Sequence, residues 1–215
     1  MLLEEYKAKY NTEDAAPGWD AIDAQLDKVY TIAPRHYGSI IKYILGGKDP
    51  IDGTSIYDNT KQEKHLHFVT YGMSELYYNE EAIDNEFSKW GFEFTFRLKP
   101  FKGDNGEDPM WVINMMNNLA RYVFESGRWF EENQFVPANG PIRIDTDTDI
   151  TGLIFMLDPE LGKIQTPHGE VSFLQMVGIT SKELEELLKN PKKTEVEKLA
   201  NQLRQTNPML ITDLE

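Results

Sequence analysis

Residues 92–98 alternate strictly between apolar and polar side chains, and this alternation constrains the fold more than any other feature of the sequence. The apolar positions are Phe92, Phe94, Phe96 and Leu98. The polar positions between them are Glu93, Thr95 and Arg97. A period of two predicts a β-strand that presents the apolar side chains on one face and the polar ones on the other. We therefore expect a sheet with an apolar face and Phe94 buried on it.

Two helices are marked by their ends. Pro17 begins a stretch with apolar residues at helical spacing as far as residue 30, and we expect the intervening aspartates, Asp23 among them, to face solvent. Asp108 is placed to cap a second helix, and Gly127 is placed to end it. Two further helices are expected after the capping-box patterns that begin at Thr180 and Thr194.

Three further segments have the composition of strands: residues 65–71, 153–157 and 171–177. We expect the last two to be joined by a turn at residues 166–169. Helices and strands without regular alternation predict an α+β fold, a single mixed domain with a mainly antiparallel sheet flanked by helices. Residues 1–16 are polar and are expected to form a frayed or loosely docked lead-in to one domain spanning residues 17–215.

The chain is strongly acidic: 36 acidic and 22 basic residues give 215 residues a net charge of −14. Such a chain is repelled by nucleic-acid phosphates and by anionic membranes. The charge serves either general solubility or attraction to a basic partner, and composition alone leaves both open. The sequence contains no Cys, and we find no signal-peptide pattern and no run long enough to span a membrane. We therefore expect a cytoplasmic protein.

Few residues suggest chemistry. His65 and His67 would share one face of a strand, which is a possible two-ligand metal geometry. The sequence fixes no third ligand beside them, so a pair of hydrogen-bonded strand histidines is the preferred interpretation, with no metal and no cofactor. No nucleophile with a matching base is recognisable. We therefore predict a protein that is not an enzyme.

Residues 71–86, called here the acidic segment, combine tyrosines with carboxylates. This composition is typical of surfaces that bind Arg- or Lys-rich proteins, although the aromatic residues could equally belong to the core. The residues predicted to bind a partner are Tyr71, Glu75, Tyr77, Tyr78, Asn79, Glu80, Glu81 and Asp84.

Several blocks of the sequence together resemble the Suppressor of fused domain, in order from residue 17 to residue 214. They include PGWDAI at 17–22, PRHYG at 34–38, LGGKDPIDG at 45–53, HFVTYGMSELY at 67–77, GFEFTFRL at 91–98, and NLARYVF at 118–124. The resemblance implies an α+β protein-binding domain. It also implies that the acidic segment corresponds to the part of the domain that lies close to bound peptide.

The resemblance implies two kinds of partner. Animal members hold a short extended peptide of a Gli transcription factor between this domain and a second, C-terminal one. Stand-alone bacterial members are associated with polymorphic toxin systems, in which they are proposed to be immunity proteins. We therefore expect an immunity protein, or antitoxin, that binds a basic and possibly nuclease toxin. The alternatives are a general peptide-binding or scaffold module without a toxin partner and, less favoured, a metal-dependent enzyme centred on His65 and His67.

Overall fold

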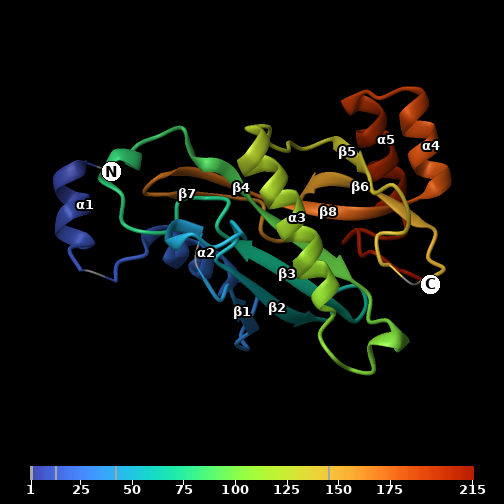
Figure 1. The fold of residues 1–215 in the computed structure, drawn as a ribbon, viewed down its shortest axis with the longest axis horizontal. Coiled ribbons are helices and arrows are strands. Elements are labelled where there is room, and N and C mark those ends of the chain that lie inside the picture. Colours follow the sequence, from blue (N-terminus) through green and yellow to red (C-terminus); the bar gives the residue numbers. More distant parts are fainter. Residues whose placement is uncertain (1, 13, 42, 145) are drawn as a thin grey trace.

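The computed structural model describes residues 2–12, 14–41, 43–144 and 146–215, which are arranged as Figure 1 shows. The helices are α1 (Leu3–Lys9), α2 (Pro17–Leu26), α3 (Met110–Ser126), α4 (Ser181–Lys189) and α5 (Lys193–Leu203), with short 3-10 turns η1 (Tyr43–Leu45), η2 (Glu80–Ala82) and η3 (Lys102–Asp104). The strands are β1 (Arg35–Gly38), β2 (Gly53–Asn59), β3 (His65–Tyr71), β4 (Phe87–Leu98), β5 (Gln134–Pro137), β6 (Ile150–Leu157), β7 (Lys163–Thr166) and β8 (Gly169–Thr180).

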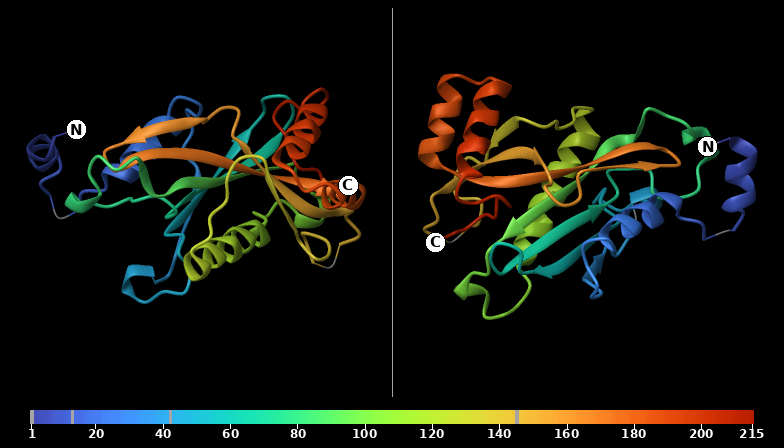
Figure 2. Two further views of the ribbon diagram at one scale, coloured as in Figure 1. Left: turned by 90° about the horizontal axis from the view of Figure 1, so that it is seen from above. Right: turned by 180° about the vertical axis from the view of Figure 1, so that it is seen from behind.

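All of these strands join one sheet in the order β1-β2-β3-β4-β8-β6-β5, and β7 also pairs with β8. Only β4 and β8 run parallel among the pairs of the described chain, and the other neighbours are antiparallel. Figure 2 shows α3 on one side of the sheet, α2 on the other, and α4 with α5 at one end. The structure is thus the predicted α+β domain with a mainly antiparallel sheet flanked by helices.

The apolar face of β4 packs beneath α3, as the alternation predicts. Phe94 and Phe96 are fully buried in the largest apolar cluster, to which α3 contributes Val112 and Met116. The helix ends where predicted, because Gly127 adopts the left-handed conformation, with φ of 69°, that closes a helix C-terminus. Burial of this apolar surface is the main force that holds α3 against the sheet.

Two smaller clusters attach the remaining helices. On the opposite face of the sheet, Ile22 and Leu26 of α2 pack against Val69 of β3. At the end of the sheet, Leu187 of α4 and Val196 of α5 pack against the C-terminal half of β8. Both faces of the central strands are therefore covered.

Because both faces are covered, the polar face of β4 is buried as well. Arg97 has no exposed surface, and its Nη2 atom donates to Oδ1 of Asp158 at 3.0 Å. Asp158 also lies 3.0 Å from Nε2 of His67. Burial opposes ionisation of Asp158, but contacts with His67 and Arg97 hold the pKa of its carboxyl well below its usual range. Each buried charge therefore depends on its partner, since removal of one would leave the other unpaired.

Two expectations about helix caps are wrong. Asp108 does not cap α3, whose N-cap is Pro109, because the carboxylate accepts hydrogen bonds from Arg35 and Tyr37 instead. Thr194 does not cap α5 either, since that helix begins at Lys193. The capping box at Thr180 is confirmed.

Two other expectations need correction. The turn at residues 166–169 joins β7 to β8 rather than β6 to β8, because the short strand β7 intervenes. Asp23 does not face solvent freely: it is half-buried and accepts a hydrogen bond from the hydroxyl of Tyr71 at 2.8 Å. The lead-in, expected to be frayed or loosely docked, contains the helix α1, whose Tyr6 side chain is fully buried.

Candidate partner-binding surface

The acidic segment leaves the end of β3 and is fixed at its base by a buried carboxylate. Glu93 has no exposed surface. Its Oε1 atom accepts from the backbone N–H of Gly72 at 3.0 Å, and from the N–H and hydroxyl of Ser74 at 2.9 and 2.6 Å. Its Oε2 atom accepts from the hydroxyl of Thr70 at 2.7 Å. Burial raises the pKa of Glu93, and these donors oppose the rise. The polar face of β4 thereby sets the direction in which the segment leaves the sheet.

The first turn of α2 holds the middle of the segment. The backbone N–H of Gly18 donates to the carbonyl of Leu76 at 3.0 Å. The approach is so close that a Cβ atom on Gly18 would lie 2.0 Å from the carbonyl oxygen of Glu75. Tyr77 is tied separately, because its hydroxyl donates to Asp52 at 2.8 Å. The segment is therefore built into the domain.

The predicted binding residues divide by exposure. Tyr71 lies in the core, where its ring stacks on Trp19 at 4.3 Å. The half-buried members are Glu75, Tyr77, Tyr78 and Asn79. The exposed members are Glu80, Glu81 and Asp84. Tyr71 is thus placed to support the segment from below, while the carboxylates are open to solvent.

The exposed carboxylates cluster around η2, the short turn that Asn79 caps by accepting from the N–H of Glu81 at 3.1 Å. Glu80 accepts from the hydroxyl of Tyr78 at 2.7 Å and pairs with Lys7 of α1 at 2.9 Å. These two contacts lower the pKa of Glu80. Glu80 is therefore ionised and paired, and the exposed carboxylates of Glu81 and Asp84 beside it suit a basic partner.

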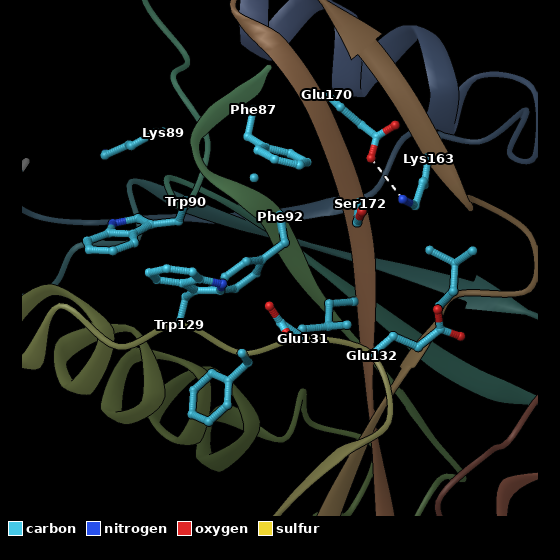
Figure 3. Close-up of a pocket in the computed structure, with 14 residues that line it drawn as sticks. Phe87, Lys89, Trp90, Phe92, Trp129, Glu131, Glu132, Lys163, Glu170 and Ser172 are labelled. Carbon is cyan, nitrogen blue, oxygen red and sulfur yellow. Dashed lines mark hydrogen bonds and ion pairs between the residues drawn. The ribbon is translucent and has the colours of Figure 1, made fainter. Parts of the chain in front are cut away.

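A groove with aromatic walls lies beside the acidic segment, where β4 departs from regular pairing with β8 between Phe87 and Phe92. We call it the Trp129 groove; its volume is about 440 Å³. Figure 3 shows Phe87, Trp90 and Trp129 arranged around it. Phe87 is 51% exposed and Trp129 is 54% exposed. Large apolar rings left open to solvent next to a groove are typical of interaction sites.

Charged side chains border the Trp129 groove. Glu170 is paired with Lys163 at 2.8 Å, and this pair is drawn in Figure 3. Glu131 is paired with Lys193 of α5, and Glu132 also lines the groove. An apolar floor with a mixed polar rim is the usual anatomy of a protein-binding site.

Apolar surface continues from the groove toward the β1–β2 loop. The rings of Trp90 and of Phe124 on α3 have centres 5.5 Å apart, and the rings of Phe124 and of Tyr43 in η1 have centres 5.1 Å apart. The loop itself exposes Ile40, which is fully open, and Leu45, which is 74% exposed. Sequence analysis did not identify the Trp129 groove or this loop. The available signal was the apolar run at residues 40–45, which lies between turn residues and belongs to no predicted strand or helix.

His65 and His67 share a face of β3 but point into the buried network. Nδ1 of His65 lies 2.8 Å from the carbonyl of Glu63, to which it must donate, and Nε2 accepts from Arg97 at 2.9 Å. Nδ1 of His67 lies 2.6 Å from the hydroxyl of Tyr30. Their ring nitrogens are therefore used by the protein itself. Among the described residues no group of three or more His, Cys, Asp or Glu side chains is arranged to hold a metal ion.

Comparison with known proteins identifies the family. The sequence profile described as Suppressor of fused protein matches residues 47–215. The chain belongs to the Suppressor of fused family. In Suppressor of fused this domain is a protein-interaction module.

Relatives of the Suppressor of fused family extend the match. The chain is 35% identical to the human Suppressor of fused homolog over 180 residues, which are 78% of this chain and 36% of the human protein. It thus spans about a third of the length of that relative. The mouse homolog is 34% identical over the same number of residues, with the same coverage of each chain.

Solved Suppressor of fused structures share the fold. A chain of the Sufu–Fu complex has a TM-score of 0.80 and 30% identity, over 94% of this chain and 91% of that one. The structure of Drosophila Suppressor of Fused also has a TM-score of 0.80, with 29% identity over 93% of this chain and 50% of that one. A putative homolog from Neisseria gonorrhoeae, at 15% identity over 87% of this chain and 89% of that one, has a TM-score of 0.55, which reflects the fold alone. In the described ranges no helix is long and apolar enough to cross a membrane.

Proposed function

We propose that the chain acts by binding another protein, and that it does so with the Trp129 groove and the adjoining acidic segment. The observation that carries this proposal is the pair of half-exposed aromatic side chains, Phe87 and Trp129, on a groove next to exposed carboxylates. An apolar side chain of the partner fills the groove, and basic side chains flanking it face Glu81 and Asp84. This arrangement combines an apolar anchor with a charged rim.

The groove favours an extended partner segment over a folded surface. It lies where β4 departs from regular pairing with β8 between Phe87 and Phe92, so that a partner backbone can run beside the strand while alternate side chains enter the groove. A complex structure with Fu exists for a relative, which supports protein binding as the activity of this chain. Protein binding without catalysis is consistent with the engagement of His65 and His67 in the buried network.

The finer proposal is an immunity protein that neutralises a basic toxin in the cytoplasm. It is supported by the net charge of −14, because a nuclease toxin needs a basic surface to bind phosphates and would be steered toward an acidic inhibitor. A regulatory scaffold of the Suppressor of fused type, without a toxin partner, uses the same surface. Co-purification with the product of a neighbouring toxin gene distinguishes the two.

Both proposals require the Trp129 groove to bind an extended basic segment. We test this with short extended peptides, each of which has one central aromatic residue and flanking lysines or arginines. We expect Phe87→Ala and Trp129→Ala to weaken binding of the best peptide by at least about tenfold each, as is usual for aromatic anchors. Leu188→Ala is the matched control, because Leu188 is 53% exposed on α4, at the far end of the sheet. Equal affinity of all three variants and the parent would refute the groove as the binding site.

A further inference from the structure

Among the described residues of α1, Tyr6 is the buried one, and it anchors the helix to the rest of the domain beside the exposed Lys7–Glu80 ion pair. Tyr6 has no exposed surface, whereas its neighbours Leu2 and Leu3 are 72% and 42% exposed. Figure 1 shows α1 at one end of the molecule, apart from the sheet and α3. A helix this short is marginal in isolation, so the Tyr6 contact decides whether α1 is docked.

The tyrosine hydroxyl enters a site with defined hydrogen-bond directions. Nδ1 of His168 lies 3.0 Å from the carbonyl of Glu75 and must donate to it, since a carbonyl only accepts. Nε2 of His168 therefore accepts from the hydroxyl of Tyr6, at 2.7 Å. The Tyr6 oxygen in turn accepts from the backbone N–H of Asn79 at 3.0 Å. Burial lowers the pKa of His168 and raises that of Tyr6, which keeps both groups in these neutral forms.

The walls of this site select the ring and the residue that follows it. Tyr6 stacks on Tyr78 with ring centres 4.9 Å apart and an angle of 24°. The rings of His168 and Tyr6 meet edge-on, with ring centres 5.6 Å apart. Lys7, the next residue, reaches Glu80 at 2.9 Å. The Tyr6 site thus makes separate contacts with an aromatic ring, with its hydroxyl and with the cation of the next residue.

We propose that the Tyr6 site is a recognition site for a tyrosine followed by a basic residue, and that α1 occupies it as a replaceable cover of the acidic segment. A partner that presents the same pair of side chains displaces α1 and gains Tyr78 and Glu80 as contacts. The proposal rests on the proposed function, in which a partner binds at the acidic segment, and it adds which partner side chains bind there: a tyrosine followed by a basic residue. Its test uses only this chain and a peptide of its own sequence, so that it can fail while binding in the Trp129 groove stands.

Phenylalanine is the discriminating analogue. It would fill the same volume but would leave Nε2 of His168 and the N–H of Asn79 without their partner. Because two polar groups would lose their hydrogen-bond partner at once, affinity should fall by at least about tenfold. A site that merely buries an aromatic ring would bind both residues equally.

The experiment uses the full chain with Tyr6→Ala, which empties the site, and a fluorescent peptide of residues 2–10 as the probe. We expect the peptide to bind the Tyr6→Ala chain at least about tenfold more tightly than it binds the parent, whose site is filled. The same peptide with phenylalanine in place of tyrosine should bind at least about tenfold more weakly. Should Tyr6→Ala fail to fold, Tyr6→Phe weakens the docking of α1 instead, because it removes the hydroxyl that His168 and Asn79 contact; the tyrosine peptide should then bind this chain at least about tenfold more tightly than it binds the parent.

Release of α1 is measured separately by trypsin cleavage at Lys7 and Lys9. Tyr6→Ala should accelerate cleavage, while Leu3→Ala, an exposed residue of the same helix, should leave it unchanged. Absence of peptide binding to the opened chain, equal binding to the parent, or equal binding of the tyrosine and phenylalanine peptides would each overturn the proposal.

Discussion

Truncation of Phe94 to alanine removes a ring that no solvent reaches, from the strand on which the domain is organised. The ring is enclosed by three others: Phe92, Phe130 and Phe155 have ring centres 5.0, 6.0 and 6.3 Å from it. These rings come from β4, the loop after α3, and β6. Because α3 closes the cluster from above, the neighbours have little freedom to collapse into the space left behind.

Loss of a buried Phe side chain usually costs about 3–5 kcal/mol, and the cost rises with the cavity that remains. We expect about 4 kcal/mol for Phe94→Ala, which for a domain of this size lowers Tm by roughly 8–16 °C. Urea unfolding followed by tryptophan fluorescence measures the free energy directly. Phe87→Ala is the control, because that ring is 51% exposed and should cost less than about 1 kcal/mol. A cost below about 1 kcal/mol for Phe94→Ala would mean that the packing beneath α3 is misjudged.

Two further predictions concern the histidines of β3. Burial lowers the pKa of His65 to about 4, below the 6.5 of the unfolded chain. The stability linked to neutral His65 is therefore complete above about pH 6.5 and is lost as the pH falls toward 4. Urea unfolding between pH 7 and pH 4 should therefore show a weaker loss of stability for His65→Asn, which keeps a donor for Glu63, than for the parent; identical pH profiles would contradict this. We also expect chain purified without added metal to hold less than one equivalent of zinc and to keep its Tm in chelator, because the nitrogens of His65 and His67 are already engaged; a tightly held metal lost together with stability would reverse this conclusion.

Much of the fold follows from short-range patterns in the sequence. The alternation at residues 92–98 placed Phe94 correctly, the bounds of β3 agree with the β-branched and aromatic run at residues 65–71, and Gly127 ends α3 as its backbone freedom requires. These features depend on neighbours within a few residues. The capping box at Thr180 is of the same kind.

What the sequence did not reveal depends on contacts between distant residues. Asp108 resembles an N-cap, but Arg35 competes for its carboxylate from 73 residues away. The alternation places Arg97 on the polar face of its strand, but it does not reveal the buried ion pair with Asp158, which lies 61 residues later in the sequence.

The candidate site shows the same limit. The tyrosines of the acidic segment cannot be sorted by composition, and the structure buries Tyr71 while leaving Tyr78 partly open. Docking of Tyr6 depends on His168, 162 residues away. The Trp129 groove exists only because the loop after α3 returns to β4.

Charge reversal at two sites of equal size tests whether a basic partner binds at the acidic segment. One variant carries Glu80→Lys, Glu81→Lys and Asp84→Lys. The matched control carries lysine in place of Glu185, Glu186 and Glu197, which are exposed on α4 and α5. Both change the net charge equally, and exposed charges contribute little to stability.

The measurement is the association rate constant with the basic partner, or with the best basic peptide, at low and high salt. We expect the acidic-segment variant to associate about tenfold more slowly than the control variant at low salt and to lose most of its salt dependence. If both variants slow association by the same factor, only the net charge matters and the acidic segment is not the binding surface.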